Sequence, residues 1–130
     1  MILTPEFWFL YTVLDDCYFK CYEDDLGGLC GELSPDIWAD GLPVDMATVE
    51  DWYAVCKAQG YCEQNAVDCV LLFLESYEKD FGFSLKKAKE LIRGLTESEI
   101  AAYHQKAAQA AKEHSAKHPD GAEPPKTGVE

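Results

Sequence analysis

The sequence predicts an all-α fold, a compact helical bundle of about five to seven helices. Apolar residues recur at intervals of three and four along most of the chain, and no segment alternates between apolar and polar residues with a period of two. Neither Asp40-Gly41 nor Asp120-Gly121 is flanked by segments that could pair as strands. A chain of 130 residues is long enough for one hydrophobic core. We therefore expect a single helical domain.

The first two elements are predicted by a capping signal and by apolar spacing. Thr4-Pro5-Glu6 is a hydroxyl cap, a proline at the first helical position and an acid in the first turn, and apolar residues then follow one face to about Tyr22. Asp24-Asp25 begins a second, short element that keeps helical spacing to Leu33. Its glycines at 27, 28 and 31 are poor helix formers, and we expect them to allow close backbone packing.

Two further capping signals lie in the middle of the chain. Ser34-Pro35-Asp36 predicts a short helical turn that includes Trp38 and stops at Asp40-Gly41. Asp45 is expected to cap a helix over residues 46–59, which Gly60 ends, and Trp52 has the spacing of a core residue in this helix.

The second half of the chain contains three predicted helices. Residues 63–81 are the most apolar segment and are expected to form the central core helix. Ser84 is expected to begin a lysine-bearing helix over residues 85–93. Thr96 and Glu99 form a capping box that begins a long Ala-rich helix to about residue 117. Few large apolar residues lie in this last helix, so we expect it to project from the body or to pack on a second copy.

These elements predict a simple domain organisation. We expect an acidic helical body over residues 1–94, a C-terminal helix of the same domain over residues 95–117, and a disordered tail over residues 118–130. Prolines and glycines in the last segment argue against a packed structure there.

Negative charge is concentrated in the first 80 residues. They contain 17 Asp or Glu and three Lys, whereas residues 81–130 contain seven acids and eight bases. Such an imbalance favours a basic partner and disfavours nucleic acid and anionic membranes, although acidity also serves solubility. The small basic patch from Lys86 to Arg93 is expected to contact solvent or acids of the same protein.

The sequence contains no pattern that indicates catalysis or a cofactor. There is no glycine-rich phosphate loop, no H-E-x-x-H motif and no nucleophile motif. The six cysteines lack C-x-x-C spacing, so we expect buried, inert thiols and no metal site. No basic signal segment or membrane-length apolar run is present, and we expect a cytoplasmic protein that is not an enzyme.

The segment from Asp24 to Trp52 is the predicted binding surface. It interleaves eight acids with two tryptophans and with glycine and proline turns, a composition typical of protein interfaces in which an aromatic ring is the anchor and carboxylates meet Lys or Arg at the rim. The candidate partner-binding residues are Asp24, Asp25, Glu32, Asp36, Trp38, Asp40, Asp45, Glu50 and Asp51.

The same segment carries a family resemblance. Its motifs are D-L-G-x-L-x-G-x-L-S-P from Asp25, W-x-D-G-x-P-x-D-x-A from Trp38, and L-E-x-Y-E-K-x-F-G from Leu74. Over about residues 7–92 the chain resembles small acidic helical bacterial proteins that are similar to immunity proteins found beside polymorphic or contact-delivered toxins. The resemblance implies a cytosolic inhibitor that binds a toxin domain and blocks its active site. It assigns no toxin-contacting residue.

Several functions are compatible with these patterns. The leading hypothesis is an acidic protein-binding module, an immunity protein for a toxin with a basic active-site groove. The alternative is a structural or adaptor protein that forms a homodimer through its C-terminal helix. A mimic of nucleic acid and a metal-dependent enzyme are further hypotheses.

Overall fold

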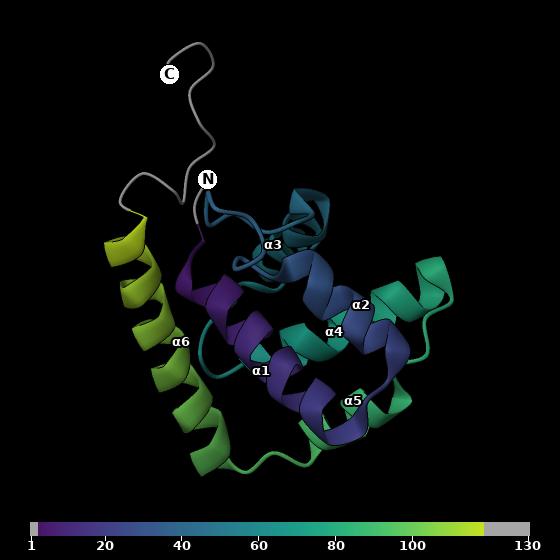
Figure 1. The fold of residues 1–130 in the computed structure, drawn as a ribbon. Helices are drawn as coiled ribbons and strands as arrows, with labels where there is room; N and C mark the ends of the chain where they lie inside the picture. The colour runs from purple at the N-terminus through teal and green to yellow at the C-terminus, as the bar shows by residue number, and fades with distance from the viewer. Residues whose placement is uncertain (1–2, 119–130) are drawn as a thin grey trace.

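The computed structural model describes residues 3–118, and these residues form six α-helices and no strand (Figure 1). The predicted all-α fold is confirmed. The tail expected from residue 118 onward lies, apart from His118, outside the described residues. The helices are α1 (Pro5–Cys21), α2 (Asp24–Leu33), α3 (Met46–Gln59), α4 (Ala66–Phe81), α5 (Lys86–Arg93) and α6 (Glu97–Lys117).

The central helix of the bundle is α1, and the prediction that residues 63–81 form it is wrong. All five other helices contact α1, whereas α4 packs mainly on α3 and α5. Four successive residues of α1, from Phe7 to Leu10, are buried, so the start of this helix is covered on all sides. The apolar spacing of α4 predicts more burial than the structure shows, because Leu72 is exposed and Val67 and Leu71 are only partly buried.

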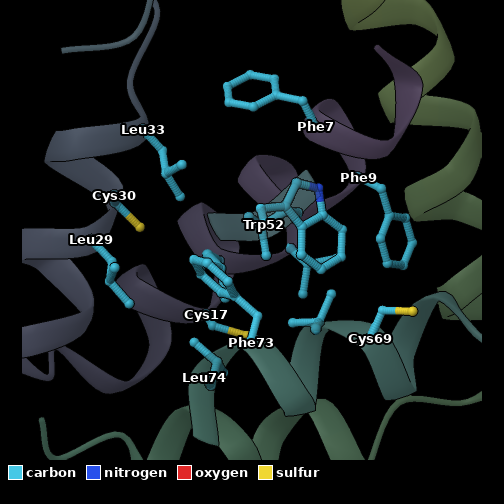
Figure 2. Close-up of a cluster of buried hydrophobic side chains, with 14 of the residues drawn as sticks. Phe7, Phe9, Cys17, Leu29, Cys30, Leu33, Trp52, Cys69, Phe73 and Leu74 are labelled. Atoms are coloured by element: carbon cyan, nitrogen blue, oxygen red, sulfur yellow. The ribbon is translucent and has the colours of Figure 1, made fainter. Parts of the chain in front are cut away.

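Trp52 joins α3 to the helices around it (Figure 2). Its side chain is fully buried, and its indole N–H donates a hydrogen bond of 3.0 Å to the backbone carbonyl of Glu6 in α1. The ring meets Phe73 of α4 edge-on, with centroids 5.7 Å apart. The core position predicted for Trp52 is therefore confirmed, and this residue connects three helices.

The last helix does not project from the body. It packs along α1 and runs in the opposite direction (Figure 1). His104 stacks on Phe9 with ring centroids 4.3 Å apart, and His114 contacts Trp8 at 5.3 Å. His114 Nε2 also donates to the carbonyl of Gly41 at 2.7 Å, which ties the end of α6 to the segment after α2. Histidine rings and alanines therefore form the face of α6 that packs on α1, although this helix contains few large apolar residues.

Capping predictions hold at α3 and α6 and in part at α1. Thr4 is the N-cap residue of α1, with proline at the first helical position, but its hydroxyl contacts the Tyr53 hydroxyl and makes no capping hydrogen bond. Asp45 caps α3 through its side chain, and the reciprocal capping box of Thr96 and Glu99 is present. The predicted end of α3 is confirmed too, because Gly60 adopts the left-handed conformation that glycine tolerates best.

Three predicted helix starts are wrong. Residues 35–40 form bends and a turn in place of a helical turn, because the side chains of Ser34 and Asp40 accept backbone hydrogen bonds from residues two positions ahead. Helix α4 begins at Ala66, after a turn that the Asn65 side chain closes. Ser84 does not cap α5: the first amides of this helix donate to the carboxylate of Glu23.

The three glycines of α2 differ in their surroundings. A Cβ on Gly27 would lie 2.7 Å from the Tyr18 ring, so the expected close packing is present at this position. Gly28 and Gly31 have no neighbouring atom within 4 Å of the corresponding Cβ position. Close packing therefore explains only one of the three, and the other two leave open space beside α2.

We expect Trp52→Ala to lower the free energy of unfolding by about 3–5 kcal/mol, because it removes a fully buried ring and leaves a cavity between three helices. Trp38→Ala is the matched control, since Trp38 is 52% exposed, and its effect is expected to stay within about 0.5 kcal/mol. Urea unfolding followed by circular dichroism measures both. Equal losses in the two variants would contradict the assigned core.

Candidate functional site

The predicted binding residues separate into groups. Asp24 lies in a groove between α1 and α2, and the exposed Asp36 and Trp38 lie on the segment that borders this groove. A separate pocket is lined by Glu32, Asp45 and Asp51. The remaining residues, Asp25, Asp40 and Glu50, line neither hollow.

Several of the predicted acids have structural roles. Asp25 accepts a hydrogen bond of 2.7 Å from the Ser84 amide and so holds the chain before α5. Asp40 and Asp45 each accept a backbone amide at 2.9 Å, from Leu42 and Ala47 respectively. These three carboxylates stabilise turns and helix ends. Glu50 is exposed on α3.

The α1–α2 groove has a volume of about 380 Å³ and combines acidic, aromatic and glycine walls. Its lining residues come from the two helices and from the segment after α2. The residues that line it are Tyr11, Asp15, Tyr18 and Phe19 of α1, Asp24, Gly27, Cys30 and Gly31 of α2, and Ser34 and Ile37 of the following segment.

Asp15 is the acidic groove residue that sequence reasoning missed, and this reasoning also missed the apolar Phe19 and Ile37. Burial raises the pKa of its carboxyl, the negative charges of Asp16 and Asp36 raise it further, and Lys106 offsets this only in part. The ion pair of Lys106 is with Asp16, at 3.3 Å. Asp15 is thus a partly buried carboxylate in a negative potential, an arrangement more typical of functional sites than of surfaces. The sequence signal that could have indicated this residue is the pair Asp15-Asp16 within a mostly apolar helix.

Three cationic side chains of the described residues form ion pairs, each with an acid outside the predicted binding residues. The ion pairs within residues 3–118 join Lys89 to Glu78, Arg93 to Glu75 and Lys106 to Asp16. Two of them use the predicted basic patch, which contacts acids of the same protein as expected. None includes a predicted binding residue, and within residues 3–118 the groove carboxylates Asp15 and Asp24 have no ion pair.

Exposed apolar side chains lie beside these acids. Phe19 and Ile37 line the groove and are both 61% exposed, and Trp38 follows Ile37 in the chain. Large side chains exposed next to carboxylates resemble the anchor and rim of a protein interface. Gly31 keeps the groove open on the α2 side, because a side chain there would enter unoccupied space.

Four of the six cysteines are buried thiols. Cys17, Cys30, Cys56 and Cys69 are buried, and burial is the main cause that raises the pKa of each thiol, to about 11 for Cys17 and about 12 for Cys30 and Cys56. Such thiols are largely protonated at neutral pH and react slowly. Cys62 is exposed.

Searches for other kinds of site gave negative results within the described part of the chain. No three side chains of His, Cys, Asp or Glu come together there as a metal-binding group. None of the helices in residues 3–118 combines the length and apolar character needed to cross a membrane.

A scan of protein-family models, a search of curated proteins and a search of solved structures found no match to the chain.

We expect Asp15→Asn to raise the free energy of unfolding at neutral pH by about 0.5 kcal/mol. A raised pKa means that the folded protein binds this proton more tightly than the unfolded chain, so the contribution of Asp15 to stability is lost as the pH rises through the folded-state pKa. The gain in stability from Asn should disappear below the usual pKa of Asp, where Asp15 is protonated. Urea unfolding of both proteins, from neutral pH to below that pKa, measures the difference in stability.

Asp16→Asn is the matched control for this prediction. It changes the same charge at the next residue but breaks the ion pair with Lys106, so its stability at neutral pH should be unchanged or lower. A loss of stability in Asp15→Asn as large as that in Asp16→Asn would show that Asp15 is not an uncompensated carboxylate.

Proposed function

We propose that this chain is an acidic protein-binding module, and that it acts without catalysis as an immunity protein for a toxin with a basic active-site groove. The observation that carries the proposal is the α1–α2 groove, where Asp15 and Asp24 lie beside exposed Phe19 and Ile37. Carboxylates would steer a basic surface toward the groove, and the apolar side chains would slow its release. The family resemblance supports the toxin as the class of partner.

Exposed aromatic groups also bear on the hypothesis of nucleic-acid mimicry. A mimic requires carboxylates spaced along a surface like phosphates. In this protein the carboxylates of the groove alternate with large apolar side chains, and Asp25, Asp40 and Asp45 are held in turns and caps. This arrangement favours a folded protein surface as the ligand.

Self-association through α6 is the alternative function. The large buried side chain of α6, Tyr103, already packs on the body, and the outward positions include Ala108, Gln109 and Lys112. Such a face offers little apolar area to a second copy. Analytical ultracentrifugation distinguishes the two functions, because the proposed module binds its partner as a monomer whereas the adaptor sediments as a dimer.

The direct test uses the products of the genes adjacent to the gene for this chain, among which the proposal predicts a toxin domain. We expect tight binding by calorimetry that weakens strongly as salt is raised, together with protection of cells that express the toxin domain. Absence of binding at low salt would overturn the proposal.

Gly31→Leu should weaken this binding by about tenfold or more, because the new side chain fills the α1–α2 groove. Its helix should be at least as stable as before, since glycine is a poor helix former. Ala58→Leu adds a leucine at an exposed position in the last turn of α3 and is the matched control, with affinity expected to stay unchanged. Equal affinities of the two variants for the toxin domain would exclude the groove as the binding surface.

A further inference from the structure

We propose that the pocket between α2, α3 and α4 binds the guanidinium group of an arginine side chain. This α3–α4 pocket has a volume of about 210 Å³ and is lined by carboxylates on one side and aromatic rings on the other. The inference deepens the proposed function and rests on it for the source of the arginine, a basic partner protein. The pocket itself can be tested without that partner.

Three carboxylates line the pocket, and neutral donors hold each of them in place. Glu32 accepts a hydrogen bond of 2.7 Å from the Thr48 hydroxyl, and Asp51 accepts one of 2.6 Å from the Tyr77 hydroxyl. Asp45 accepts the Ala47 amide. These bonds fix the orientation of the carboxylates but do not neutralise them. None of the ion pairs found within residues 3–118 includes one of these acids.

The charges of Asp51 and Glu32 both act on the Tyr77 hydroxyl, which lines the same pocket. Burial is the largest cause that raises the pKa of the Tyr77 hydroxyl. Its hydrogen bond to Asp51 and the charges of Asp51 and Glu32 raise the pKa further. A cation placed at the same point would be stabilised by the field that disfavours the phenolate.

Aromatic rings form the other wall. The ring centroid of Tyr77 lies 5.0 Å from that of Phe81 and 5.6 Å from that of Phe83. Phe81 is 62% exposed at the end of α4, where Gly82 in the left-handed conformation reverses the chain and returns Phe83 to the same cluster. An exposed ring therefore stands within the same pocket as three carboxylates.

The pairing of rings with carboxylates selects a guanidinium among the common cations. A guanidinium is planar, stacks on an aromatic face and directs several N–H donors outward in its plane toward carboxylate oxygens. A lysine ammonium is compact and strongly hydrated, and it gains less from such a wall. A metal ion would leave the rings without a role, and the described residues contain no group of three metal ligands.

The test titrates the full chain with N-acetyl-arginine methylamide and follows the ring signals of Tyr77, Phe81 and Phe83 by NMR. We expect saturable shifts with a millimolar dissociation constant. The lysine analogue should bind about fivefold more weakly, and the citrulline analogue, a neutral isostere of arginine, should not bind measurably. No saturable shift with arginine, or equal shifts with citrulline, would overturn the proposal.

Asp51→Asn should weaken arginine binding by about fivefold, because it removes one charge while it keeps an acceptor for the Tyr77 hydroxyl. Glu50→Gln makes the same change of charge at the adjacent residue, outside the pocket, and should have little effect. Similar affinities of these two variants for the arginine probe would contradict the assignment of Asp51 to the site.

A second pair of variants tests occupancy without removing a carboxylate. Ala47 lines the pocket, and Ala47→Arg should abolish probe binding because the new guanidinium fills the site. Ala58→Arg places the same charge on the same helix away from the pocket and should leave binding intact. Unchanged probe binding in Ala47→Arg would overturn the site.

The two proposals fail separately. Gly31→Leu should not alter binding of the arginine probe, since Gly31 lines the α1–α2 groove and not this pocket. Arginine binding without toxin binding would leave the pocket established and overturn the proposed function. Toxin binding that is the same for Ala47→Arg and Ala58→Arg would show that the partner does not use the pocket.

Discussion

Burial of α1 by all five other helices is the constraint on which the rest of the structure depends. A helix covered on all sides at its start must be apolar there, as the run from Phe7 to Leu10 is. Trp52 fixes α3 against this helix through the Glu6 carbonyl, and α6 closes another side with His104 and His114 (Figure 2 shows Trp52 among the core residues). Asp15 and Asp16 lie on a part of α1 that these helices cover only partly.

The surroundings of the acids connect the fold to the proposed function. Many acids of the body have a neutral donor or a cation beside them, as Asp25, Asp45 and Asp16 do. Asp15 lies instead in a negative potential that raises its pKa, at a groove with exposed apolar side chains. Glycine at position 31 keeps that groove open at the expense of helix propensity in α2. Both features lower stability. In the proposed function, a bound cationic surface would compensate for the first and would need the space that the second leaves.

The sequence was sufficient for the elements whose signals are local. Proline after Thr4, the cap at Asp45 and the glycine ends are short-range features, so those helices were predicted closely. Contacts between residues far apart in the sequence could not be predicted from local patterns. Glu23 caps α5 across more than 60 residues, and α1 is central because the other five helices pack around it. For the same reason the sequence could name the candidate acids but could not separate those that stabilise turns and helix ends from those that line a groove or pocket. Trp38 was a candidate binding residue, and the structure exposes it, whereas Asp15 gained its significance only from its neighbours.

The most direct test of the central claim is an NMR titration of the Asp15 carboxyl carbon, in the free protein and in complex with the basic toxin domain. We predict a pKa above the usual value for Asp in the free protein, because burial and neighbouring carboxylates disfavour its charge, and a fall in this pKa when a cationic surface fills the groove. A pKa at or below the usual value in the free protein, or no change on binding, would contradict the account.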